Sequence, residues 1–179
     1  MAVYVALVGA PSTGKTALLN ELAKRGHAVA HEVSRQLIEE QRAIGGSILP
    51  QINRDAFQRE ILKRQIVQRV ENAHHSIVFC DTSIPCGIAY YRADGAEAPG
   101  VFLEAAREHS YDVVLLIDLL PFYEDDGLRI ENKESAKKIQ GFLRDVHAEL
   151  GHKIIEVPFM SVAQRADFIE KALKDSLNI

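Results

Sequence analysis

The 179-residue chain has no tryptophan, only two cysteines, and no apolar run longer than a strand. The lack of a long apolar run excludes a transmembrane helix, which needs about 20 such residues. The N-terminus also lacks the basic start and longer apolar core of a signal peptide. Cys80 and Cys86 have no partners for a zinc site, so we expect reduced, partly buried thiols. These absences together predict a cytoplasmic protein.

The chain also has fewer basic than acidic residues: 21 lysines and arginines against 25 aspartates and glutamates, for a net charge of −4. The basic residues are spread along the chain, so we expect no nucleic-acid partner. Apolar side chains, by contrast, are plentiful: the chain is 47% hydrophobic, which is ample for one core. This length predicts a single domain over residues 1–179.

Residues 9–16 carry the pattern G-x-x-x-x-G-K-T of a phosphate-binding loop. In such a loop, glycines let backbone N–H groups point at a phosphate, the lysine adds charge near the β and γ phosphates, and the threonine hydroxyl reaches Mg²⁺. An apolar run lies before the loop and a helix-like pattern after it, as this motif requires. We therefore expect ATP or GTP to bind with Mg²⁺. The expected nucleotide-binding residues are Gly9, Ser12, Thr13, Gly14, Lys15, Thr16 and Ala17.

Strand-like and helix-like segments alternate along the whole chain, which predicts a parallel sheet covered by helices on both faces. The first helix is expected to end at Gly26. The predicted fold is therefore α/β, with three layers and a five-stranded parallel sheet. The expected strands are 3–8, 27–30, 76–80, 113–117 and 153–157. The expected helices are 15–25, 32–43, 54–73, 84–91, 101–109, 133–150 and 162–177.

In parallel sheets, ligands lie beyond the carboxyl ends of the strands, and Asp81 follows the third strand. A carboxylate there, together with Thr16, can hold Mg²⁺, or it can take a proton from an attacking hydroxyl. The alternative is that Asp81 only caps the next helix, a position that aspartate favours.

Polar residues on two helices are candidates for binding an acceptor. Glu32 and Arg35 follow the second strand and lie one turn apart, so they can face one ligand. The alternative is an exposed ion pair within the helix. Gln58 and Gln65 share one face of the long helix and can hydrogen-bond a base or an amide, although such side chains more often lie at the surface.

The segment between the fourth strand and the next helix is acidic and contains Asp126-Gly127-Leu128-Arg129. It predicts a short lid at about 121–132. Arg129 in a lid can close over the γ-phosphate and stabilise charge in the transition state. The alternative is a solvated loop whose arginine pairs with Glu124 or Asp125.

The phosphate loop, the E-x-x-R element from Glu32 to Arg35, the strand that ends at Asp81 and the D-G-x-R segment at 126–129 together resemble the AAA-like ATPases that are grouped with the NadR-type ribosylnicotinamide kinase domain. The resemblance runs over nearly the whole chain. It implies a kinase-like P-loop NTPase fold. It also implies that ATP and Mg²⁺ lie at Gly14, Lys15 and Thr16, that Asp81 lies at the metal or the acceptor, and that Arg129 belongs to the lid.

The chain departs from many ATPases of this group after the third strand, where their D-R-G-x-x-D becomes Asp81-Thr82-Ser83-Ile84-Pro85-Cys86. The acceptor therefore stays open. The expected function is transfer of the γ-phosphate from ATP to a small hydroxyl-bearing acceptor, such as a nucleoside like ribosylnicotinamide. The expected catalytic residues are Lys15, Asp81 and Arg129, and the expected acceptor-binding residues are Glu32, Arg35 and Gln65.

Two other functions fit the same residues. One is an ATPase or GTPase switch that binds a protein or lipid partner. The other is a nucleotide-binding module without turnover, which is disfavoured because Lys15, Thr16, Asp81 and Arg129 are all present. A closed, small-molecule-sized pocket between Glu32, Gln65 and Asp81 favours a kinase, whereas an open groove favours a switch.

Overall fold

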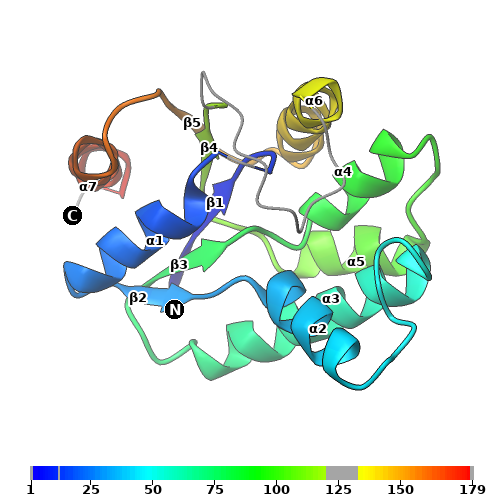
Figure 1. Cartoon of the computed structure of the whole chain (residues 1–179). Helices are drawn as coiled ribbons and strands as arrows, with labels where there is room; N and C mark the ends of the chain where they lie inside the picture. The colour runs from blue at the N-terminus through cyan, green and yellow to red at the C-terminus, as the bar shows by residue number, and fades with distance from the viewer. Residues whose placement is uncertain (1, 12, 120–132, 178–179) are drawn as a thin grey trace.

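The computed structural model of the chain describes residues 2–11, 13–119 and 133–177. Its core is a five-stranded sheet in the order β2-β3-β1-β4-β5, and every neighbouring pair is parallel (Figure 1). The predicted α/β fold is confirmed. The strands are β1 (Val3–Val8), β2 (Ala28–Ala30), β3 (Ile77–Asp81), β4 (Val113–Ile117) and β5 (Ile154–Val157).

Helices cover both faces of this sheet, which gives the three predicted layers. α1 and α7 pack on one face, and α3 to α6 on the other, with α2 against α3 (Figure 1). None of the described helices is long and apolar enough to cross a membrane. The helices are α1 (Lys15–Lys24), α2 (Val33–Ala43), α3 (Arg54–Glu71), α4 (Cys86–Ala93), α5 (Gly100–Glu108), α6 (Lys133–Glu149) and α7 (Val162–Leu177).

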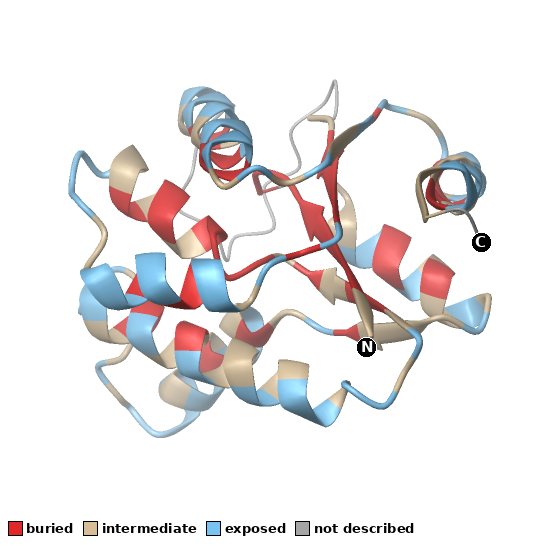
Figure 2. Cartoon of the chain, turned by 180° about the vertical axis from the view of Figure 1, so that it is seen from behind, coloured by how far each residue is buried: buried red, intermediate tan, exposed pale blue. Residues whose placement is uncertain are grey.

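The central strand β1 is apolar along its length because both of its faces are buried (Figure 2). Successive side chains of a strand point to opposite faces. Tyr4, Ala6 and Val8 therefore belong to the core under α4, α5 and α6. Val5 and Leu7 belong to the core under α1 and α7. This burial on two sides explains why β1 shows no alternation of polar and apolar residues.

Helix α1 ends as the sequence predicts, with Gly26 in the left-handed region at φ +92°. The Gly26 N–H donates to Ala23 O, and the His27 N–H donates to Leu22 O. This double closure is a Schellman motif. It uses the His27 N–H, so β2 begins at Ala28, one residue later than predicted.

The register of the sheet brings three strand ends together. Leu7 of β1 pairs with Asp81 of β3 on one side and with Leu115 of β4 on the other. Because the strands are parallel, the segments that follow them all leave the same edge of the sheet. The phosphate loop, the turn after β3 and the end of β4 therefore meet there.

Candidate functional site

The phosphate loop joins β1 to α1, and its own lysine donates hydrogen bonds back to backbone carbonyls of the loop. The Lys15 ammonium donates to Gly9 O at 2.7 Å and to Ala10 O at 3.1 Å, with a longer contact of 3.4 Å to Thr13 Oγ1. The Thr13 hydroxyl donates to Ala10 O at 3.0 Å. Thr16 and Ala17 are exposed at the start of α1, and Ser12 lies outside the described residues.

Beneath the loop lies a buried arginine that the sequence did not suggest as a site residue. Arg165 of α7 is only 4% exposed and donates from Nη1 to Thr13 O at 2.9 Å. Burial lowers its pKa from the usual arginine value. Gly14 has φ +80°, and a Cβ there would lie 3.1 Å from the guanidinium, so glycine is required at this position for two reasons.

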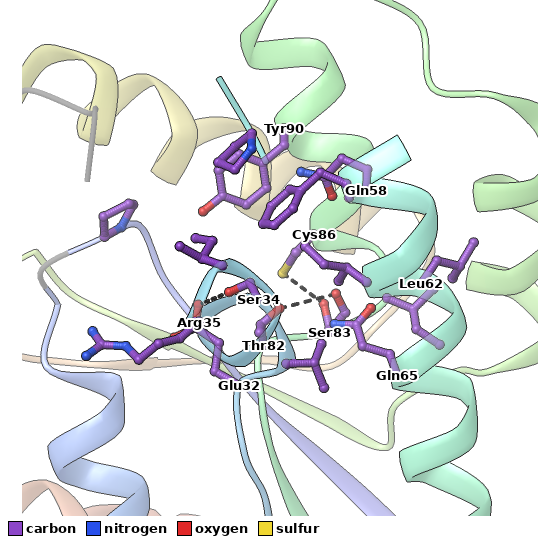
Figure 3. A pocket seen from close by; sticks show the side chains of 18 of the residues that line it. Glu32, Ser34, Arg35, Gln58, Leu62, Gln65, Thr82, Ser83, Cys86 and Tyr90 are labelled. Atoms are coloured by element: carbon purple, nitrogen blue, oxygen red, sulfur yellow. Dashed lines mark hydrogen bonds between the residues drawn. The ribbon is translucent and has the colours of Figure 1, made fainter. Parts of the chain in front are cut away.

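One cavity of about 170 Å³ extends from the phosphate loop to the helices that follow β2 and β3 (Figure 3). The loop contributes Gly9, Pro11 and Lys15 to its wall, and most of the rest comes from α2, α3, α4 and the turn after β3, with single residues from α5 and α6. A ligand in this cavity therefore lies next to the lysine that the motif assigns to the β and γ phosphates.

The two polar residues after β2 face this cavity. Glu32 is the N-cap residue of α2 and accepts a hydrogen bond from the Ser34 hydroxyl. Arg35 lines the same cavity one turn further along (Figure 3). Within the described ranges, Glu32 and Arg35 do not form an ion pair with each other, so the alternative of an intrahelical pair is not realised. Both side chains line the cavity that Lys15 also lines, and their acceptor-binding role stays a prediction.

The two glutamines of α3 also line the cavity, and one of them is buried. Gln58 is 7% exposed, so the expectation that such residues lie at the surface is wrong for this one. No described residue hydrogen-bonds its amide, and the amide atoms are not among the fully buried atoms that lack a partner, so they stay accessible from the cavity. An accessible side-chain amide can both donate to and accept from a ligand. Gln58 is therefore suited to bind a polar ligand.

Asp81 is buried at the end of β3, but it does not line the main cavity. It lines a smaller one behind it, of about 10 Å³, and Gln65 and Thr82 contribute to both. Of the predicted pocket, Glu32 and Gln65 thus line the main cavity, and Asp81 lines only the smaller one. Helix α4 begins after Pro85 with no side-chain cap, so Asp81 is not its N-cap.

The turn after Asp81 is strained. Thr82 has φ +75°, and no other non-glycine residue in the described ranges has a positive φ. A β-branched residue in this region is a real outlier. Its N–H donates to Leu7 O at 3.0 Å, which ties the turn to β1. Such strain persists only where the surroundings impose it, as they do at many functional sites.

A buried histidine holds the next residue of this turn. Ser83 Oγ lies 2.8 Å from His147 Nε2, and His147 Nδ1 lies 2.7 Å from Leu143 O. A carbonyl can only accept, so Nδ1 carries a proton. Burial lowers the pKa of His147 to about 4, so the ring is neutral near pH 7. Nε2 therefore accepts from the Ser83 hydroxyl, which joins the turn to α6.

Acidification is expected to destabilise the protein through His147. The unfolded ring has a pKa near 6.5 and the folded ring one of about 4, so the unfolded state binds the proton between these values. The stability is present above about pH 6.5 and is lost as the pH falls toward 4. Between pH 7 and 4.5 the loss is about 2 kcal/mol. Urea unfolding should show that His147→Gln loses this component. The exposed His74→Gln control should keep the wild-type pH dependence, and an equal change in both variants would contradict the assignment.

The predicted lid at 121–132, with Arg129, lies outside the described residues. The role of Arg129 stays a prediction. The three predicted acceptor-binding residues, Glu32, Arg35 and Gln65, all line the cavity that Lys15 also lines.

Comparison with known proteins supports this architecture. The profile of a family described as AAA domain matches residues 4–165. No curated protein matches the sequence at a significant level. Among solved structures, the chain is similar to NadR protein in complex with NR, with a TM-score of 0.76 and 20% identity over 99% of this chain and 51% of that one.

Two further structures show the same likeness. NadR in complex with NAD and AMP-PNP has a TM-score of 0.71 and 21% identity over 99% of this chain and 50% of that one. Deoxyadenosine kinase from M. mycoides has a TM-score of 0.68 and 11% identity over 97% of this chain and 100% of that one. The chain thus spans about half the length of the NadR structures. These likenesses establish a kinase-like P-loop fold.

Proposed function

Because the chain belongs to this AAA domain family, we propose that it binds ATP or GTP at residues 9–17 and transfers the γ-phosphate to a small hydroxyl-bearing acceptor. One observation carries the proposal: the cavity that Lys15 lines also has the amide of the largely buried residue Gln58 in its wall. A site for transfer needs the phosphate and the acceptor in one enclosure, so that the reacting atoms meet in the right orientation.

The nucleotide end uses the loop as its motif predicts. Backbone N–H groups near Gly14 bind the phosphates, and Lys15 supplies positive charge. Thr16 and Asp81 offer hydroxyl and carboxylate oxygens, which are donors that suit Mg²⁺ when phosphates and water complete its shell. Bound Mg²⁺ would neutralise charge on the β and γ phosphates.

The acceptor end suits a nucleoside. Gln58 and Gln65 present both N–H donors and C=O acceptors, which match the edge of a base or a carboxamide. Phe57, Tyr90 and Phe102 add aromatic area to the same wall. The NR bound in a NadR structure and the deoxyadenosine kinase likeness support this class of acceptor, with ribosylnicotinamide as the leading candidate.

In the proposed reaction, the acceptor oxygen attacks the γ-phosphorus. A new P–O bond forms while the bond to the β–γ bridging oxygen breaks, and ADP leaves. Asp81 is the proposed group that takes the hydroxyl proton or orients the metal, and Glu32 and Arg35 position the acceptor. Arg129 is proposed to stabilise the charge on the transferred group.

The test is whether nucleotide turnover depends on the acceptor. With ATP, Mg²⁺ and a panel of nucleosides that includes ribosylnicotinamide, ³¹P NMR should show a phosphorylated nucleoside and faster ADP release than with water alone. In Gln58→Leu, kcat/KM for the acceptor should fall about tenfold or more while the Kd for ATP stays unchanged, because only the acceptor end loses its hydrogen bonds.

The alternative outcome is informative. If only inorganic phosphate appears, at a rate that no acceptor changes, the kinase proposal is wrong. The protein would then act as a slow ATPase or GTPase, which is the expected behaviour of a switch that binds a protein or lipid partner.

A further inference from the structure

A side chain of α6 holds one peptide group of the phosphate loop. The Ala10 N–H donates to Gln140 Oε1 at 2.7 Å, and Gln140 Nε2 donates to Ile117 O at 3.0 Å. The glutamine thus spans the gap between the loop and the end of β4. It lies between the buried residues Ile139 and Leu143 of α6, so its helix is anchored in the core.

The partners of Gln140 fix the orientation of its amide. A backbone N–H can only donate and a backbone carbonyl can only accept. Oε1 must therefore face Ala10, and Nε2 must face Ile117. A flipped amide would set two donors against each other and two acceptors against each other, so only one arrangement of the side chain satisfies both contacts.

The peptide that Gln140 holds is also the one that receives Lys15. Gly9 O and the Ala10 N–H belong to the same planar peptide unit, so one cannot turn without the other. The carbonyl accepts from Lys15 Nζ at 2.7 Å, and the N–H donates to Gln140 at the same distance. The position of the lysine ammonium therefore depends on a glutamine about 130 residues away.

We propose that Gln140 is a positioning residue for Lys15, and this rests on the proposed nucleotide binding. An ammonium has three donors. Among the described residues, the ammonium engages Gly9 O and Ala10 O, and its contact to Thr13 is the longest of the three at 3.4 Å. A phosphate oxygen can replace that long contact while the two carbonyls keep the ammonium in place. Gln140 sets the direction of the first of these carbonyls.

The packing around Gly9 leaves this peptide little freedom. A Cβ on Gly9 would lie 3.0 Å from Ile117 O, which is the same carbonyl that accepts from Gln140. The loop, the end of β4 and the Gln140 amide therefore form one closely packed unit. Loss of the Gln140 side chain removes the two hydrogen bonds that hold this unit together.

The experiment compares Gln140→Leu with wild type, with Gln51→Leu as an exposed control. The Kd for ADP should rise about tenfold, since the lost hydrogen bonds act on the lysine that reaches the β-phosphate. The Kd for AMP, which has no β-phosphate, should change less than twofold by calorimetry. The Ala10 amide should exchange its hydrogen at least about tenfold faster, while the amides of Val5 and Leu7 in β1 keep their wild-type rates.

Gln140→Glu keeps the acceptor for the Ala10 N–H but sets its second oxygen against Ile117 O, so exchange at Ala10 should lie between the wild-type and Gln140→Leu rates. Exchange at Ala10 that stays at the wild-type rate in Gln140→Leu would overturn the inference, as would an unchanged ADP affinity or equal losses for ADP and AMP in that variant. If the wild-type protein binds neither ADP nor ATP, the proposed function fails first, and the role of Gln140 falls with it.

Discussion

The Lys15→Ala variant is expected to lose the thermal stabilisation that Mg-ATP or Mg-GTP gives to the wild-type protein. A ligand at about a hundred times its Kd adds roughly 2.7 kcal/mol to the folded state, which raises the Tm of a protein this size by roughly 5–10 °C. Without the ammonium, the loop loses its charge toward the β and γ phosphates. Differential scanning fluorimetry with and without nucleotide should therefore show no shift for the variant.

The control for this experiment is another lysine of the same helix. Lys24 is exposed in the last turn of α1, and Lys24→Ala should keep the full nucleotide-dependent shift. Lys15 also binds Gly9 O and Ala10 O, so the unliganded Tm of the variant must be compared as well. If a correctly folded Lys15→Ala protein still shows the wild-type Tm shift, the nucleotide binds somewhere other than this loop.

The Asp81→Asn variant is expected to bind nucleotide within about tenfold of wild type while turning over about 10² times more slowly. The loss of a proton acceptor or metal-water ligand weakens the transition state more than the ground state. Asparagine has the same shape, so it fits the buried position at the end of β3. Turnover with the best acceptor and the Kd for ATP should be measured on the same preparation.

Two further variants define what the result means. Asp175 is an exposed carboxylate on α7, and Asp175→Asn should turn over at the wild-type rate. Glu32→Gln removes the carboxylate that lines the main cavity. If Asp81→Asn keeps wild-type turnover and Glu32→Gln does not, the proton acceptor is Glu32, and Asp81 only supports the strand end.

The sequence predicted the elements well because their signals are local. The period of apolar residues located α3, and Gly26 located the end of α1. The phosphate loop was recognisable because its residues are consecutive and their chemistry depends on backbone geometry that glycine permits. Boundaries moved by one or two residues where a turn took up an N–H group, as at His27.

The supports of the site were not predictable in the same way. Gln140 contacts Ala10 across 130 positions, His147 contacts Ser83 across 64, and Arg165 contacts Thr13 across 152. A glutamine, a histidine or an arginine on an amphipathic helix gives no sign of which distant backbone group it will reach. Gln58 shows the same limit, because its burial depends on how α3 packs beside α4 and not on its neighbours in sequence.

The order of synthesis determines when these contacts between distant residues can form. The ribosome makes β1 and the phosphate loop before α7, because Arg165 follows Thr13 by 152 residues. At about 5–20 residues per second, roughly 10–30 s separate the two during translation. The nascent chain thus carries the whole G-x-x-x-x-G-K-T sequence before Gln140 and Arg165 exist to shape it. The loop therefore gains its contacts from Gln140 and Arg165 only after α6 and α7 have been made.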